Sequence, residues 1–272
     1  MSKSNDFEFG DKSVASSYEE ILVPVMFDPW ARELINDYPL WNNSRILDLA
    51  AGTGIVTRLL SEKIGDDGSI IAVDINSEML EIAKEKLGNP NSNVIFIESS
   101  ADSIDQTSNS FDVVVCQQGF QFFPDKLAVA KELKRLLKSD GRAIISTWQP
   151  VSECQFFGVI CESLEIIDEK EISDLMRKPF DFLGWEELSG YFDDAGFSLV
   201  TVDEKKLPLK ISGGIDQAIK MAYATPIGPK LRSLDDSKQK QFVNEMSKLL
   251  EELTEDGKAY GSLVSNILVA EK

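Results

Sequence analysis

One stretch, residues 45–60 (RILDLAAGTGIVTRLL), constrains the fold of this chain more than any other. It opens with an apolar run of the kind typical of a strand buried on both faces: Ile46, Leu47 and Leu49. Small residues follow at 50–54, and apolar positions then recur at helical spacing over 56–64. A strand, a small-residue turn and a helix let the backbone approach a ligand closely and point a helix N-terminus at it.

Two classes of ligand fit such a turn. A dinucleotide fingerprint requires a third glycine three residues after Gly54, and Thr57 occupies that position. An NAD-dependent oxidoreductase is therefore the weaker alternative. The pattern present is an acid in the strand followed by small residues at alternate positions, namely Asp48, Ala50, Gly52 and Gly54. An ordinary tight turn of an α/β protein is the third interpretation.

This pattern resembles the first motif of the class I S-adenosylmethionine-dependent methyltransferases, in which an acid and small residues precede Gly-Thr-Gly. A second apolar strand at 69–74 ends in Asp74, twenty residues after Gly54. An acid there can accept hydrogen bonds from both ribose hydroxyls, although a role at a helix N-cap competes with this interpretation. By position, Ile75 would lie against the adenine ring.

The segment after the third strand (93–97) departs from the family pattern. Relatives commonly place an acid directly before alanine where the adenine amino group binds. This chain has Ser100, Ala101 and Asp102 there, so the acid is shifted by two positions. The resemblance implies that these residues hold the adenine, by Asp102 or by a backbone carbonyl.

The fourth strand (111–116) runs into QQGFQFFPD, which matches a variant of the family's fourth motif. The resemblance places Gln117 near the sulfonium, where an amide forms a hydrogen bond without adding charge. The aromatic residues that follow belong either to the core or to the apolar wall of a substrate pocket: Phe120, Phe122 and Phe123. We take Phe122 and Phe123 as candidate substrate contacts.

Strands alternating with helices over 45–148 predict a doubly wound, Rossmann-like α/β sheet. The resemblance implies seven mostly parallel strands with an antiparallel last strand. We expect one domain over 1–272, with a cofactor-binding core at 45–148 and a helical cap inserted at 212–257. Residues 14–40 are predicted to form two short helices, separated at prolines, that either cover the cofactor, with Tyr18 in contact, or simply pack on the sheet.

The amino-acid composition excludes several classes of binding partner. Asp plus Glu number 46 against 28 Lys plus Arg, a net charge of −18 that disfavours nucleic acid. Three cysteines without paired spacing and the absence of histidine argue against a disulfide framework and a metal site. The polar N-terminus is unlike a signal peptide, and no apolar run is long enough to span a bilayer. We expect a cytoplasmic protein with a small-molecule substrate.

The resemblance implies direct in-line transfer of a methyl group from S-adenosyl-L-methionine to a small molecule, with S-adenosyl-L-homocysteine as product. The fourth motif is similar to the quinone-biosynthesis-like and natural-product branches of the family. Because the sulfonium is already an activated leaving group, the protein mainly positions the reactants, and the pattern identifies no catalytic residue. The alternative from another class is a catalytically silent binding or regulatory protein, which need not have kept Gly52, Gly54 and Asp74. The acceptor and the oligomeric state lie beyond the sequence.

Overall fold

The computed structural model describes residues 12–39, 41–88, 93–181, 184–255 and 259–272. Their contacts group the chain into two compact units. The unit that we call the sheet unit comprises Phe27–Thr147, Leu183–Glu204 and Asn266–Lys272. The other, the helical unit, comprises Met1–Met26, Trp148–Phe182 and Lys205–Ser265.

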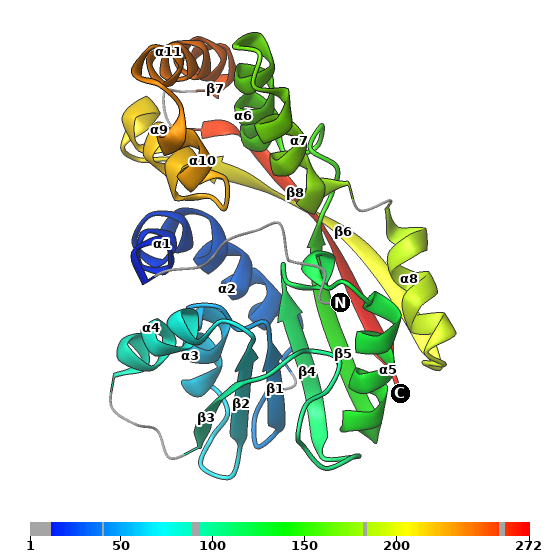
Figure 1. The fold of residues 1–272 in the computed structure, drawn as a ribbon. Coiled ribbons are helices and arrows are strands. Elements are labelled where there is room, and N and C mark those ends of the chain that lie inside the picture. The colour runs from blue at the N-terminus through cyan, green and yellow to red at the C-terminus, as the bar shows by residue number, and fades with distance from the viewer. Residues whose placement is uncertain (1–11, 40, 89–92, 182–183, 256–258) are drawn as a thin grey trace. The chain divides into compact units, whose positions relative to one another are not determined.

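The strands follow the order β3-β2-β1-β4-β5-β8-β6 (Figure 1). Strands β1 to β5 pair in parallel, and the last strand, β8, is antiparallel. This confirms the predicted doubly wound, mostly parallel sheet. A two-residue strand, β7 (Thr254–Glu255), also pairs with β8. The strand bounds are β1 Arg45–Leu49, β2 Ser69–Asp74, β3 Val94–Glu98, β4 Phe111–Gln117, β5 Leu137–Trp148, β6 Leu199–Lys210 and β8 Ala259–Glu271.

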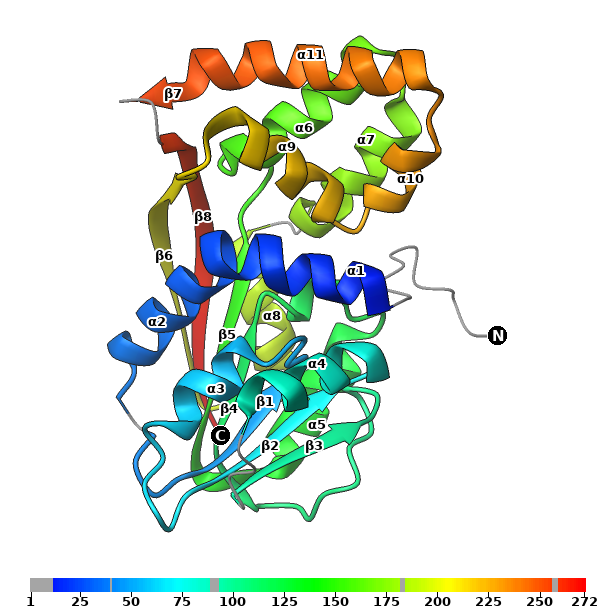
Figure 2. The same cartoon turned by 90° about the vertical axis from the view of Figure 1, so that its left-hand side faces the viewer.

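Helices cover both faces of the parallel strands in the sheet unit (Figures 1 and 2). On one face lie α3 (Ile55–Ser61) and α4 (Ser77–Leu87), with α2 (Asp28–Asp37) packed on α3. On the other lie α5 (Lys126–Leu136) and α8 (Trp185–Asp194), which pack together. This two-sided cover explains why β1 is buried from Ile46 to Leu49 and reads as an apolar run.

Strand β5 includes a segment whose composition is typical of a turn. The Ser-Asp-Gly segment before Arg142 has the composition of a turn, yet the strand already begins at Leu137. Phe111 pairs with Leu137 and Val113 with Arg142, so a bulge in β5 absorbs the extra residues. Gly141 lies within this bulge, where a Cβ atom would come within 3.0 Å of the Phe111 carbonyl oxygen. Turn composition here marks a bulge within a strand rather than its boundary.

The N-terminal segment is one continuous run of helix, and the predicted break into two helices is wrong. Helix α1 (Lys12–Ser17) passes into a π-helix, η1 (Tyr18–Phe27), and then into α2. Pro24 lies in the π-helical part, whose wider turns accommodate a residue that lacks an N–H group. Pro29 is the second residue of α2, in the first turn after the π-helical part ends, a helix position at which proline is common.

The helical unit is built around α11, which packs on α6 and on α9, while α6 packs on α7 and α9 on α10 (Figure 2). Fully buried side chains recur four residues apart along α11, at Phe242, Met246 and Leu250. The described part of 212–257 is therefore mainly helical, and its role as a cap over an acceptor stays a prediction. No helix in the described ranges is both long and apolar enough to cross a membrane. The bounds are α6 Gln155–Ile166, α7 Lys170–Arg177, η3 Lys178–Phe180, α9 Gly214–Ala224, α10 Gly228–Ser233 and α11 Asp236–Leu253.

Because α4 packs against the turn after β1, the two glycines of the turn differ in how much space a side chain would have. Both Gly52 and Gly54 have positive φ, but a Cβ atom on Gly54 would lie 2.8 Å from the Ala83 Cβ atom of α4. A Cβ atom on Gly52 would have no neighbour within 4 Å among the described residues beyond the adjoining ones. We expect Gly54→Ala to lower the free energy of unfolding by roughly 2–4 kcal/mol and Gly52→Ala by about 1–2 kcal/mol. Chemical denaturation of both variants measures the difference. Equal losses would show that α4 does not rest on the turn.

Candidate functional site

The turn after β1 repeats one backbone conformation at alternate residues. Ala50, Gly52 and Gly54 have φ values of 55°, 54° and 82°, in the left-handed region. The Gly54 N–H donates to the Ala51 carbonyl at 2.8 Å, and the Ala51 N–H donates to the Val73 carbonyl of β2 at 3.0 Å. Small residues at alternate positions are therefore the sequence signature of this conformation. Because the space beside Gly52 is open, a ligand can approach the backbone there.

Asp74, at the end of β2, holds the turn in place. Its Oδ2 atom accepts a hydrogen bond from the Gly52 N–H at 2.8 Å, and its Oδ1 atom accepts one from the Asn76 N–H at 2.9 Å. Burial raises the pKa of Asp74, and these backbone donors oppose the rise. The N-cap of α4 is Asn76, whose side chain accepts from the Met79 N–H at 3.1 Å. A carboxylate has about four acceptor positions, so these backbone donors leave acceptor capacity for a ligand hydroxyl.

Asp48 lies beneath the turn, with only 1% of its surface exposed. Its Oδ2 atom accepts a hydrogen bond from the Thr57 hydroxyl of α3 at 2.5 Å. Burial raises the pKa of Asp48 to about 7, and the Thr57 hydrogen bonds oppose this rise. Thr57 takes the place of the third glycine of a dinucleotide fingerprint, and here its hydroxyl joins the motif acid to α3.

The segment after β4 packs directly against this turn. A Cβ atom on Gly119 would lie 2.5 Å from the Ala50 Cβ atom, so only glycine allows the two segments to approach so closely. Gln117 donates from Nε2 to the Phe27 carbonyl at 3.1 Å, while its buried Oε1 atom has no hydrogen-bond partner among the described residues. Gln118 has a φ of 55°, and its N–H donates to the Ser146 carbonyl of β5 at 3.0 Å.

The three phenylalanines that follow divide between the two predicted roles. Phe120, in the 3₁₀ turn η2 (Phe120–Phe122), is fully buried, with its ring centroid 5.4 Å from that of Phe192 in α8. Phe123 packs edge-on against Phe120 at 5.7 Å, and both Phe122 and Phe123 keep part of their surface exposed. Phe120 is therefore a core residue, and the exposed parts of the other two leave a pocket role open to them.

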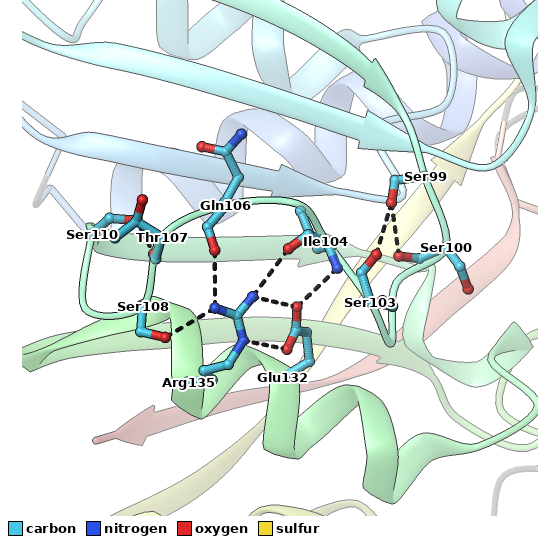
Figure 3. Close-up of polar contacts among 10 residues, drawn as sticks. All are labelled: Ser99, Ser100, Ser103, Ile104, Gln106, Thr107, Ser108, Ser110, Glu132 and Arg135. Carbon is cyan, nitrogen blue, oxygen red and sulfur yellow. Dashed lines mark hydrogen bonds and ion pairs between the residues drawn. The ribbon is translucent and has the colours of Figure 1, made fainter.

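The loop between β3 and β4 is fixed by an ion pair on α5 (Figure 3). Arg135 donates to the carbonyl oxygens of Gln106 and Ile104 at 2.9 and 3.0 Å, and Glu132 accepts from the Ile104 N–H at 2.8 Å. The pair itself is joined at 2.7 Å. Our sequence analysis missed both residues, because a Glu and an Arg three positions apart on a helix look like an ordinary surface pair.

The start of this loop carries the residues predicted to hold adenine. The Ser99 N–H donates to the Asp74 carbonyl at 3.0 Å, which ties the loop to the end of β2. The Ser100 hydroxyl donates to Asp102 Oδ1 at 2.6 Å, and both side chains are exposed, while Ala101 is partly buried. Ile75, next to Asp74, is 69% exposed, which is unusual for a large apolar side chain and leaves it free to pack on a flat ligand.

The sheet unit thus joins three of the predicted segments at the carboxyl ends of its parallel strands: the turn after β1, the end of β2 with the loop after β3, and the segment after β4. The contacts that join them are Gly52 with Asp74, Asp74 with Ser99, and Ala50 with Gly119. Ligands of open α/β sheets bind at this edge. Tyr18 belongs to the helical unit, where it is partly buried at the start of η1, and its contact with a cofactor stays a prediction.

Comparisons with known proteins agree with this geometry. Residues 46–141 match the model of a family described as a methyltransferase domain. The chain is 29% identical over 204 residues to the demethylmenaquinone methyltransferase of Staphylococcus aureus, an alignment that covers 70% of this chain and 84% of that relative.

Two solved structures show the same fold. A putative methyltransferase from Bacillus halodurans superposes with a TM-score of 0.57 at 17% identity, covering 89% of this chain and 98% of that one. Phosphoethanolamine N-methyltransferase 2 of Haemonchus contortus, in complex with S-adenosyl-L-methionine, gives a TM-score of 0.62 at 17% identity, covering 96% of this chain and 57% of that one. The parallel sheet and its turn thus define an α/β protein with the methyltransferase fold. The matched domain and the curated relative support a more specific assignment, to the class I S-adenosylmethionine-dependent methyltransferases.

The raised pKa of Asp48 predicts an unusual dependence of stability on pH. Between about pH 4 and 7 the folded protein keeps a proton on Asp48 that the unfolded chain releases, so this carboxyl lowers stability as pH rises. We expect Asp48→Asn to gain roughly 2–4 kcal/mol of stability relative to the unsubstituted protein between pH 4 and pH 8. Denaturant titrations of both proteins at a series of pH values measure this.

Asp112 provides a control, because its pKa is shifted in the opposite direction to that of Asp48. Partial burial alone would raise the pKa of Asp112, but hydrogen bonds from Lys138 Nζ at 2.6 Å and the Arg45 N–H at 2.8 Å lower it. The stability that this carboxylate contributes is present above its unfolded pKa and is lost as pH falls through its folded pKa. Asp112→Asn should therefore cost more at pH 7 than at pH 3. If the two variants changed in the same direction with pH, the burial of Asp48 would not be the cause.

Proposed function

We propose that the chain binds S-adenosyl-L-methionine on the turn after β1 and transfers its methyl group to a small-molecule acceptor. The observation that carries this proposal is the open backbone at Gly52, tied by its N–H to the Asp74 carboxylate. A ligand with an amino-acid end and a ribose suits Gly52 and Asp74. The amino-acid end can approach the bare backbone of Gly52, and the ribose hydroxyls can donate to the remaining acceptor positions of Asp74.

The remaining residues fit the other parts of the cofactor. The exposed side chain of Ile75 offers an apolar surface to one face of adenine, and the edge of that ring would meet Ser100, Ala101 and Asp102. The unpartnered Oε1 atom of Gln117 offers a neutral dipole beside the sulfonium. Asp48 supports the turn through Thr57 rather than through an exposed surface of its own.

The cofactor supplies the reactivity when it is bound, because its sulfonium is an activated leaving group. The acceptor's electron pair forms the new bond to the methyl carbon as the carbon–sulfur bond breaks, leaving S-adenosyl-L-homocysteine, and a protonated acceptor releases its proton. The chain's part is alignment and exclusion of water, and alignment alone contributes roughly 7–11 kcal/mol in well-oriented systems. The sequence has no histidine, so any base must be a different side chain.

The net charge of the chain and the names of its relatives both support a small metabolite as the acceptor. The relatives are named for demethylmenaquinone and for phosphoethanolamine, both small molecules, which supports a metabolite acceptor. A net charge of −18 repels the phosphates of nucleic acids. All three cysteines are free and buried, as suits a reducing compartment, and we keep the cytoplasmic location as part of this proposal.

The ribose contact is tested by Asp74→Asn. The substitution keeps the size of the side chain but removes its charge and half of its acceptor capacity, so we expect the affinity for S-adenosyl-L-homocysteine to fall by about ten- to a hundredfold, as for hydrogen bonds to a charged group. Calorimetry measures the affinity. Glu78→Gln is the matched control, since Glu78 is a neighbouring carboxylate in the first turn of α4. Equal affinities of Asp74→Asn and the control would remove Asp74 from the binding site.

Methyl transfer is tested with cofactor labelled in the methyl group and a panel of amines, phenols, quinols and carboxylates. We expect one labelled product with an equal amount of S-adenosyl-L-homocysteine. The matched inactive protein is Gly52→Val, because a β-branched side chain is strained at a φ of 54° and would fill the open space beside the backbone. Tight binding of the cofactor without transfer to any member of the panel would favour the silent binding protein. Preference for NAD over S-adenosyl-L-homocysteine would overturn the proposal altogether.

A further inference from the structure

Gln121 is a buried amide whose polar atoms lack hydrogen-bond partners in the described part of the chain. It lies in η2, immediately after β4, with 8% of its surface exposed. Neither its Oε1 nor its Nε2 atom has a hydrogen-bond partner among the described residues. Buried side-chain amides are normally satisfied, because an unpaired polar group has lost its water without replacement. A side chain kept in this state points to a ligand that completes its hydrogen bonds.

The position of Gln121 relates it to the proposed site. The segment that carries it contacts the turn after β1, since Gly119 packs directly against Ala50. Other buried polar atoms on these same two segments also have no hydrogen-bond partner among the described residues, among them the Thr53 hydroxyl and Gln117 Oε1. Unsatisfied polar atoms therefore occur on both of the segments that pack together at Gly119 and Ala50. Thr53 and Gln117 lie on segments that the cofactor would contact, whereas nothing in the proposed cofactor position uses Gln121.

The charged groups near Gln121 along the chain already have partners. Lys126 Nζ donates to the Phe123 carbonyl at 3.0 Å, and Asp125 caps α5 by accepting from the Ala128 N–H at 2.9 Å. On α8, which packs on α5, Glu187 accepts from the Tyr191 hydroxyl at 2.9 Å. An ionic ligand group would need a free opposite charge in such a buried place, whereas an uncharged group that both donates and accepts matches a primary amide.

We propose that the Gln121 amide binds the methyl acceptor through an uncharged hydroxyl or amide group of that molecule and so determines which acceptors are used. The partly exposed rings of Phe122 and Phe123 flank this amide in sequence and form the apolar contact for the ring or chain that carries the group. This inference rests on the proposed function, because the acceptor must lie beside the cofactor. Gln121 acts here as a specificity residue that takes no proton and forms no covalent bond.

The first test is stability, which requires no ligand. Gln121→Leu replaces an unpaired amide by an apolar side chain of similar size, so we expect the Tm of the full chain to stay the same or to rise. The matched control is Thr225→Val, which removes a buried hydroxyl that donates to the Ala222 carbonyl at 2.7 Å and should lower the Tm. A fall in the Tm of Gln121→Leu as large as that of the control would show a structural role for the amide and overturn the inference.

The second test uses the probes p-cresol, p-xylene and p-toluate, which carry a hydroxyl, a methyl and a carboxylate on the same ring. They are titrated into the protein saturated with S-adenosyl-L-homocysteine. The readout is the side-chain amide signal of Gln121 in ¹⁵N–¹H spectra, assigned by its loss in Gln121→Leu. We expect p-cresol to shift this signal at concentrations at least tenfold below those needed for p-xylene or p-toluate. Gln121→Leu lacks the signal, so its binding is followed by calorimetry, and we expect it to bind p-cresol and p-xylene within about threefold of each other.

The outcomes separate this inference from the proposed function. If p-cresol leaves the Gln121 signal unchanged, or if p-toluate shifts it best, the inference is wrong, while methyl transfer to another acceptor would keep the proposed function. If S-adenosyl-L-homocysteine itself does not bind, the proposed function fails and the inference fails with it. Gln121→Leu should retain the unsubstituted protein's affinity for S-adenosyl-L-homocysteine within twofold, and a larger loss would place Gln121 in the cofactor site instead.

Discussion

The hydrogen bonds that Asp74 accepts from the Gly52 and Asn76 N–H groups hold the rest of the site together. They tie the turn after β1 to the end of β2 and to the first residues of α4. The left-handed conformation at Ala50 and Gly52 accompanies this tie, since the Ala51 and Gly52 N–H groups both face β2. Once the turn is so placed, α4 packs against Gly54 and the segment after β4 packs against Ala50.

The two acids of the motif have different physical roles although both are conspicuous in the sequence. Asp74 is partly buried and keeps acceptor capacity at the edge of the sheet, where a ligand can use it. Asp48 is buried under the turn and bonded to Thr57, so its contribution is to join β1 to α3. In a chain with a net charge of −18, a second buried acid close to Asp74 is best accommodated when it holds a proton.

Much of the fold could be predicted because its signals are local. Apolar runs marked β1, β2 and β4, helical periodicity marked α3, and the small residues from 50 to 54 marked the turn. Two local signals misled: the Ser-Asp-Gly segment lies in a bulge of β5, and Pro24 lies inside η1. In each case neighbouring structure compensates for the unfavourable composition. Arg135 and Glu132 could not be predicted as supports of the loop after β3, because their partners lie about thirty residues away and are mainly backbone atoms.

The sequence by itself determined the sheet, the turn and the class of the protein, because burial on two faces and left-handed backbone leave clear signatures in residue type. Only the tertiary structure decided which polar groups are satisfied and which are left free. Asp48 and Asp74 look alike in the sequence, and so do Gln117, Gln118 and Gln121. Their difference depends on partners supplied by other strands and helices. An unpaired amide such as that of Gln121 becomes visible only when the atoms around it are in place.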